Sequence, residues 1–255
     1  MLIINADDWG RDGQTTHRIH DCVQRGTISS VSAMVFMEDS QRAAEMARDS
    51  KVYTGLHLNF TTEFTSPRCP PTLLDHQRRV SRFLLKRPGA QVLFHPGLVS
   101  SFEYLVRAQY DEFATLYGCY PERLDGHHHM HLCANVLFQR LLPRGTIVRR
   151  NFSFGPGEKS VWNLMYRRTV DIVLARRHRV TDYFFSIAPL EPSERLHHIF
   201  ALATDSVVEV ETHPADRAEY RFLMSGEVFQ YFPSIAVAHT VVAQIAPYER
   251  STECN

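Results

Sequence analysis

The first sixty residues alternate between short apolar runs and amphipathic stretches, and this alternation constrains the fold more than any other feature. Residues 2–6, 31–36 and 52–59 have the apolar and β-branched composition of buried strands. Residues 14–25 and 38–48 have the spacing and residue types of helices. Strands that alternate with helices form βαβ units, so we predict a parallel sheet.

The same alternation continues beyond an irregular region. Residues 60–99 are rich in proline and contain one expected helix at 73–86, and we interpret them as an excursion that forms a lid or substrate rim. Later strands are expected at 122–125, 146–149, 181–185 and 207–212, and later helices at 101–117, 134–142, 161–177, 193–203 and 235–245. In the helix at 161–177 the candidate core positions are Trp162, Met165, Val170, Val173 and Leu174.

Polar side chains stand at the carboxyl ends of four expected strands. Asp7 and Asp8 end the first expected strand, and His57 ends the third. A histidine run at 127–131 follows the strand expected at 122–125, and His213 follows the strand expected at 207–212. An open doubly wound sheet and a (β/α) barrel both fit the number of strands, and no Gly-x-Gly-x-x-Gly or P-loop pattern indicates a nucleotide site. In a barrel these ends converge on one face, which holds the active site. We therefore predict an irregular, TIM-barrel-like α/β fold.

Composition excludes several classes of protein. The 255 residues fit a single domain over 1–255, and 44% apolar residues can fill its core. Lysine plus arginine and aspartate plus glutamate each number 28, so the zero net charge argues against nucleic-acid binding. We expect no membrane span and no signal peptide. The five cysteines form no Cys-x-x-Cys pair, so we expect neither disulfides nor a zinc ribbon, and a cytoplasmic location.

Residues 125–131 read Asp-Gly-His-His-His-Met-His, so four of the 14 histidines lie within five positions. Imidazole is the commonest protein metal ligand, and this density favours metal binding or catalysis even for the run alone. The other strand-end residues have simpler explanations when each is taken singly. The pair Asp7-Asp8 can cap a helix, His57 can be a hydrogen-bonded core histidine, and His213 can simply end a strand. Their shared position favours one common site.

These groups together predict a metal-dependent hydrolase. One carboxylate of the Asp7-Asp8 pair, His57 and one histidine of the run would surround a divalent ion and leave positions open for water and substrate. Because neighbouring side chains on a strand point to opposite sides, the other carboxylate can act as a general base. A bound divalent ion lowers the pKa of its water towards ~7 and polarises a carbonyl, and His213 can protonate a leaving amine. The expected substrate is an amide or an ester.

Four runs carry a family likeness: 5–10 (N-A-D-D-W-G), 55–61 (G-L-H-L-N-F-T), 124–131 (L-D-G-H-H-H-M-H) and 211–214 (E-T-H-P). In this order they resemble the motifs of the YdjC-like carbohydrate deacetylases, the family that includes chitooligosaccharide deacetylase. Residues 26–32 are also similar to the family's sequence after its first helix. The resemblance implies an irregular (β/α) barrel that removes the acetyl group from an N-acetylated sugar, with one divalent metal ion, zinc or magnesium.

Carried over by position, the resemblance implies roles for single residues. Asp8, His57 and His127 would bind the metal, Asp7 would be the general base and His213 the general acid. The residues expected to contact substrate or to support these groups are Asn59, Asp125, His129, His131 and Arg149. His131 is also an alternative ligand, because it would share the face of His127 if a helix began there.

Two positions depart from the family motifs. Trp9 stands where the family has phenylalanine, which is a modest change. Gly126 stands where it has serine, so a hydroxyl beside the histidine run is lost and a supporting hydrogen bond changes.

Two other functions are compatible with the same residues. One is a metal-dependent phosphoesterase or lactonase on the same barrel, although a phosphoesterase usually needs two or three metal ions with more ligands. The other is a sugar-binding relative without catalysis. A His/His/Asp set suits zinc, cobalt, nickel or manganese, and an oxygen shell completed by water suits magnesium. A homo-oligomer is also compatible with the sequence.

Overall fold

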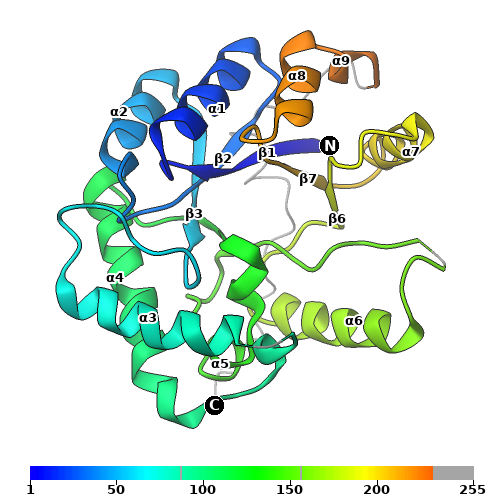
Figure 1. Ribbon diagram of the computed structural model, residues 1–255. Coiled ribbons are helices and arrows are strands. Elements are labelled where there is room, and N and C mark those ends of the chain that lie inside the picture. Colours follow the sequence, from blue (N-terminus) through cyan, green and yellow to red (C-terminus); the bar gives the residue numbers. More distant parts are fainter. Residues whose placement is uncertain (87, 156, 232–255) are drawn as a thin grey trace, which may run out of the picture.

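Seven parallel strands curl around the centre of the molecule, and helices surround them (Figure 1). The computed structural model describes residues 1–86, 88–155 and 157–231. The strand order is β5-β4-β3-β2-β1-β7-β6, and every pairing is parallel. The predicted alternation of strand and helix is therefore confirmed, and it gives one α/β domain.

The elements follow one another along the chain with short connections. The strands are β1 (Leu2–Trp9), β2 (Ser30–Ala33), β3 (Tyr53–Leu58), β4 (Arg123–Gly126), β5 (Ile147–Val148), β6 (Tyr183–Ser186) and β7 (Val208–Thr212). The α-helices are α1 (Gly13–Arg25), α2 (Ser40–Ser50), α3 (Pro71–Leu85), α4 (Val99–Tyr117), α5 (Ala134–Phe138), α6 (Val161–Ala175), α7 (Ser193–Leu202), α8 (Arg217–Ser225) and α9 (Val228–Tyr231). The 3-10 segments are η1 (Ala90–Val92), η2 (Pro96–Leu98) and η3 (His127–Leu132).

The two edges of the sheet approach each other just before β6. Ile147 of β5 forms a parallel bridge with Arg179, and the backbone N–H of Val148 donates to the carbonyl of Arg179 at 2.9 Å. The chain from Arg179 leads directly into β6, which pairs with β7 on the other side. The sheet thus curls into an irregular (β/α) barrel, as predicted.

Alternation along the strands separates an apolar outer layer from a polar interior. Leu2, Ile4 and Ala6 of β1 belong to the apolar core shared with the helices. The intervening Asn5 and Asp7 instead hydrogen-bond across the barrel interior. The carboxyl ends of the strands therefore open onto a set of buried polar groups, which is where the predicted site residues lie.

Several elements differ from the predictions. In α6, Trp162, Met165 and Val173 are not core residues, since they are 80%, 55% and 44% exposed. Only Val170 and Leu174, four positions apart, are buried, because the helix packs through one narrow stripe. The apolar residues of the sequence predict a wider buried face than the structure has.

The helix expected at 134–142 ends at Phe138, and Arg140 takes a left-handed φ of 56°. Helix α8 was not predicted, although Asp216 caps its first turn by accepting from the N–H groups of Ala218 and Glu219. The helix predicted at 235–245 lies outside the described residues. No helix in the described ranges has the length and apolar character to cross a membrane.

Candidate metal centre and active site

Asp8, His57 and His127 come together from three strand ends. Asp8 lies near the end of β1 with a left-handed φ of 67°, His57 lies near the end of β3, and His127 directly follows β4. The Nδ1 atom of His127 is 2.9 Å from Asp8 Oδ1, and His57 Nε2 is 3.5 Å from the same oxygen. All three residues are buried. A non-glycine residue with positive φ is uncommon, so its place here indicates that the backbone is shaped to aim this carboxylate.

Asp8 Oδ1 provides the test of whether these residues fit a metal ion. Its other oxygen, Oδ2, accepts from Arg11 at 2.8 Å, whereas Oδ1 is buried and, among the described residues, forms no well-directed hydrogen bond, although the ring nitrogens of His127 and His57 lie close to it. A buried, unsatisfied carboxylate oxygen is costly. Two imidazoles and one carboxylate are a donor set that zinc and related divalent ions use in catalytic sites. The three residues therefore fit one divalent ion.

Asp125 fixes the orientation of the His57 ring. The Nδ1 atom of His57 lies 2.7 Å from Asp125 Oδ1, and both side chains are buried. This pair directs Nε2 towards Asp8, as carboxylate–histidine pairs do for metal-bound imidazoles. Burial opposes protonation of His57, but the charges of Asp7 and Asp125 raise its pKa to about 10. The ring nitrogen that faces Asp8 is thus held in place before any ligand binds.

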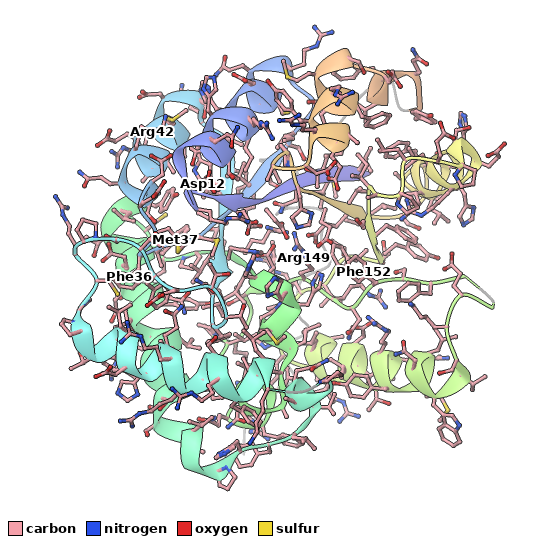
Figure 2. All side chains as sticks on the ribbon, in the orientation of Figure 1. Asp12, Phe36, Met37, Arg42, Arg149 and Phe152 are labelled. Atoms are coloured by element: carbon pink, nitrogen blue, oxygen red, sulfur yellow. The ribbon has the colours of Figure 1, made fainter. Side chains whose placement is uncertain are left out.

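Arg149 holds the carboxylate of Asp7 with two hydrogen bonds. Its terminal nitrogens are 2.7 Å from each Asp7 oxygen, and its side chain has no exposed surface. Figure 2 shows Arg149 in the middle of the molecule. Burial opposes ionisation of Asp7, but the charges of Arg149 and His57 bring its pKa below the ordinary value. Arg149 therefore orients the carboxylate of Asp7 from a fully buried position.

A second group of possible ligands, Asp7, His57 and Asp125, is also within metal-binding distance. Arg149 already bridges its two carboxylates, because the same guanidinium lies 2.9 Å from Asp125 Oδ2. A cation is thus present between them. The group that contains Asp8 is the better candidate for the metal.

His213 lies at the mouth of the site. Its side chain is 40% exposed, and its Nε2 atom is 3.8 Å from Asp7 Oδ2. The carboxylate of Glu219, in α8, accepts from the backbone N–H of His213 at 2.6 Å and so fixes the turn after β7. The imidazole can therefore reach both solvent and the space above Asp7.

The histidine run does not form one helical face. His128 and His129 have left-handed φ values of 53° and 56°, so the backbone of the run does not continue as one helix. His128 Nδ1 lies 3.0 Å from the hydroxyl of Thr61, and His129 Nε2 lies 3.6 Å from Glu211. Neither ring joins the Asp8 group.

His131 is buried on the other side of this turn. Its Nε2 is 2.9 Å from the backbone carbonyl of Arg149, so it does not share the face of His127. A Cβ atom at position 126 would lie only 2.9 Å from the backbone nitrogen of His131. Gly126 therefore allows the turn to fold back closely against β4.

Asn59 supports the backbone beyond β3. Its side-chain oxygen accepts from the N–H groups of Thr61 and Thr62 at 3.1 and 2.9 Å, and its amide donates to the Thr62 carbonyl. The residue is fully buried. Its hydrogen bonds to Thr61 and Thr62 fix the turn after β3, so Asn59 shapes the rim of the site.

The sequence interpretation missed the polar network beneath the site. Ser32 donates to Asp125, Arg123 pairs with Asp125 and Glu209, and Glu209 also pairs with Arg149. Burial and nearby carboxylates raise the pKa of Glu211 well above its ordinary value. The signal was present in the sequence, because these polar residues recur at every second position of their strands.

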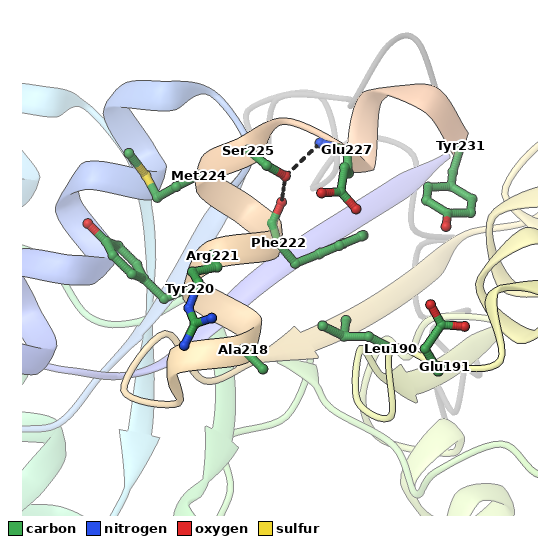
Figure 3. Close-up of a pocket in the computed structure, with 10 residues that line it drawn as sticks. All are labelled: Leu190, Glu191, Ala218, Tyr220, Arg221, Phe222, Met224, Ser225, Glu227 and Tyr231. Carbon is green, nitrogen blue, oxygen red and sulfur yellow. Dashed lines mark hydrogen bonds between the residues drawn. The ribbon is translucent and has the colours of Figure 1, made fainter.

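Two cavities lie at different distances from the clustered aspartates and histidines. One, of about 310 Å³, lies beside His128 and His129. A larger one, of about 750 Å³, lies beside α8, where Tyr220 and Phe222 are among its walls (Figure 3). It contains none of the clustered aspartates or histidines. The geometry of the side chains, and not the size of a cavity, therefore locates the site.

Comparisons with known proteins agree with this architecture. A crystal structure from Enterococcus faecalis V583, of a protein to which cleavage of cellobiose phosphate has been ascribed, has a similar fold. It aligns with a TM-score of 0.62 and 21% identity, over 97% of each chain. Chitooligosaccharide deacetylases from Proteus mirabilis and Yersinia pestis are 28% and 30% identical over 136 and 138 residues. These matches cover 53% of this chain and 52% of each relative, so the similarity spans about half the length of the curated relatives. The sequence profile of the YdjC-like proteins matches residues 1–253, and the chain therefore belongs to the YdjC-like protein family.

Proposed function

We propose that the protein is a metal-dependent deacetylase that hydrolyses the acetamide of an N-acetylated sugar to acetate and an amino sugar. The observation that carries the proposal is Asp8 Oδ1, a buried carboxylate oxygen that lies close to ring nitrogens of His57 and His127 without forming a well-directed hydrogen bond with either. The names of the similar chitooligosaccharide deacetylases support the substrate class.

Asp8, His57 and His127 would hold one divalent ion, zinc or magnesium. When bound, such an ion polarises an acetyl carbonyl and lowers the pKa of a water molecule towards ~7. The described residues provide one free group of metal ligands. In the alternative group, Asp7, His57 and Asp125, the guanidinium of Arg149 already lies between the two carboxylates. A single ion is sufficient for amide hydrolysis, whereas phosphatases and nucleases commonly use two.

Asp7 is the proposed general base. Arg149 and Asn5 hold its carboxylate, with Asn5 Nδ2 donating to Oδ1 at 2.8 Å, so its position is fixed and it stays ionised at neutral pH. It accepts a proton from the attacking water, whose oxygen forms the new bond to the acetyl carbon. Fixed geometry of this kind removes the entropic cost of orienting the base.

His213 is the proposed general acid. It lies across from Asp7 at the mouth, and its half-exposed ring can reach the nitrogen of a bound acetamide. When the carbon–nitrogen bond breaks, the nitrogen takes a proton from His213 and leaves as an amine. The proton that Asp7 received has a short path back to His213, since the two side chains are 3.8 Å apart.

Acetate release from N-acetylglucosamine and its oligomers tests the function. We expect release by the metal-loaded protein, loss of activity after chelation, and recovery when zinc or magnesium is added back. Bound metal should approach one ion per chain. Absence of release from the whole panel, with metal bound, would show that the protein only binds sugars or hydrolyses another bond.

Two substitutions separate the roles of base and ligand. Asp7→Asn should keep its metal and lose turnover by about a hundredfold or more, because the proton acceptor is gone. His57→Ala should lose both metal and turnover. His17→Ala, which removes an exposed histidine of α1, is the matched control and should change neither. Near-normal turnover in Asp7→Asn, or full metal content in His57→Ala, would contradict the assigned roles.

A further inference from the structure

Arg11 lies beside the candidate metal ligand Asp8 and contacts one of its two oxygens. Arg11 Nη1 donates to Asp8 Oδ2 at 2.8 Å. The other oxygen, Oδ1, is 2.9 Å from His127 Nδ1 and 3.5 Å from His57 Nε2. The carboxylate itself is buried. The two oxygens of Asp8 therefore have different surroundings, one beside a guanidinium and the other beside the two histidines.

The neighbouring carboxylate, that of Asp7, shows the alternative arrangement. Arg149 donates to each of its oxygens at 2.7 Å, so a guanidinium binds the whole carboxylate. Arg11 instead reaches Asp8 through Oδ2 and leaves Oδ1 to face the histidines. Two adjacent aspartates are thus held in two different ways, and only the arrangement at Asp8 leaves an oxygen for an ion.

The turn after β1 and the start of α1 fix the position of Arg11. Its backbone N–H donates to the Asp8 carbonyl at 3.1 Å, and Gly10 between them has a left-handed φ of 87°. Arg11 Nε lies 3.3 Å from Asp12 Oδ2, and Asp12 caps α1 by accepting from the N–H of Thr15 at 2.8 Å. An exposed ion pair usually contributes little to stability, but this guanidinium is anchored between a helix cap and a buried carboxylate.

We propose that Arg11 is a positioning residue of the metal centre: it holds Asp8 through Oδ2, so that the carboxylate offers Oδ1 alone to the ion. The inference rests on the metal site of the proposed function and adds the residue that limits Asp8 to one oxygen. Two imidazoles and one carboxylate oxygen suit zinc, whereas manganese prefers a shell with more oxygen ligands. Arg11 therefore favours zinc over manganese at this centre.

The test measures the dissociation constants of Zn²⁺ and Mn²⁺ for the full chain, by titration after chelation, in wild type and in Arg11→Ala. Loss of the guanidinium charge strengthens the binding of both dications alike, so the ratio of the two constants reports the number of oxygens that Asp8 offers. We expect the preference for zinc to fall about tenfold in Arg11→Ala, within the range for loss of a residue that supports a metal ligand. Arg11→Lys, which keeps a charged donor, should keep most of the preference.

The visible absorption of bound Co²⁺ gives a second measurement. This absorption weakens as the number of ligands around cobalt increases. We expect a weaker band in Arg11→Ala than in wild type, because Asp8 can then supply both oxygens.

Arg42→Ala is the matched control. Arg42 lies in α2 (Figure 2) and pairs with Asp39, three positions before it, just as Arg11 pairs with Asp8. The two arginines are also similarly accessible, at 46% and 38% exposed. Asp39 belongs to neither group of possible metal ligands in the described part of the chain. The ratio of the two constants should therefore be unchanged in Arg42→Ala.

The outcomes separate this inference from the proposed function. An unchanged ratio in Arg11→Ala, or an equal fall in Arg42→Ala, overturns the positioning role and leaves the deacetylase intact. If wild type binds neither ion, both the metal centre and the role of Arg11 are wrong. If wild type binds zinc but releases no acetate, the proposed activity is wrong, and the ratios still decide the role of Arg11.

Discussion

Replacing Arg149 with methionine tests whether the polar interior of the barrel depends on that guanidinium. The side chain is fully buried and lies within 3.3 Å of four carboxylates, those of Asp7, Asp125, Glu209 and Glu211. Arg123 is the other guanidinium of this network and contacts Asp125 and Glu209. Methionine fills much of the same volume, but Asp7 and Glu211 lose the guanidinium that pairs with them, and Arg123 remains beside Asp125 and Glu209.

The expected decrease in the free energy of unfolding of Arg149→Met can be worked out in two ways. Breaking a buried ion pair by removing one partner costs about 3–5 kcal/mol. Alternatively, the variant can protonate one carboxyl. At pH 7, and from the ordinary aspartate pKa of 3.8, this costs about 4 kcal/mol at 1.36 kcal/mol per unit. Both routes predict a loss of about 3–5 kcal/mol from a total stability of about 5–15 kcal/mol for a typical domain.

Urea unfolding of both proteins at pH 5 and pH 8 provides the assay. In the variant, the carboxyls without a cation have folded-state pKa values above their unfolded values. The folded protein then binds more protons than the unfolded protein, so its stability falls as pH rises through the raised values. In wild type the lowered pKa values of Asp7 and Asp125 affect stability only below about 4, because their contribution is lost as pH falls, whereas the raised pKa of Glu211 lowers stability as pH rises through it. The deficit of the variant should therefore be smaller at pH 5 than at pH 8.

Arg150→Met is the matched control for this experiment. Arg150 is the next residue, its side chain is one-quarter exposed, and it pairs with the single carboxylate of Asp171. Its loss should cost about 1–2 kcal/mol and depend little on pH. An Arg149→Met protein that loses less than about 1 kcal/mol, or the same amount at both pH values, would refute the account of the network as ionised and dependent on Arg149.

Three further perturbations test the centre itself. Asp125→Asn should weaken metal binding about 10–100-fold, because the carboxylate that orients His57 is lost, and a metal titration against Ser101→Ala as control measures this. Gly126→Ala should lower the melting temperature and the metal affinity together, since its Cβ would meet the backbone of His131 at 2.9 Å; an unchanged melting curve would contradict the tight turn. Removing the metal should lower the melting temperature of wild type, and raising free metal to about 100 times its Kd should restore about 2.7 kcal/mol. A melting temperature that does not change when the metal is removed or added would argue against a metal site in the folded protein.

The sequence by itself determined the order of the elements and the strand ends at which polar residues stand. Apolar runs and helical spacing are local properties, so β1 to α2 and the long helix α4 were predicted within a few residues. Asp7, Asp8, His57 and His213 each lie at or directly after such an end, and the parallel direction of the strands brings those ends to one face. Both features follow from the hydrophobic periodicity of the elements and the parallel direction of the strands.

Only the tertiary structure decided how those residues are used. The pairing of Arg149 with Asp7 joins positions 142 residues apart, and no local pattern predicts that geometry. The turn that Gly126 permits decided that His127 faces Asp8 while His131 faces Arg149, because side-chain direction depends on two left-handed residues between them. The same limit explains α6, where the sequence shows which residues are apolar but not which of them meet a neighbour. Local sequence fixes backbone periodicity, whereas the environment of each side chain depends on elements that are distant in the chain.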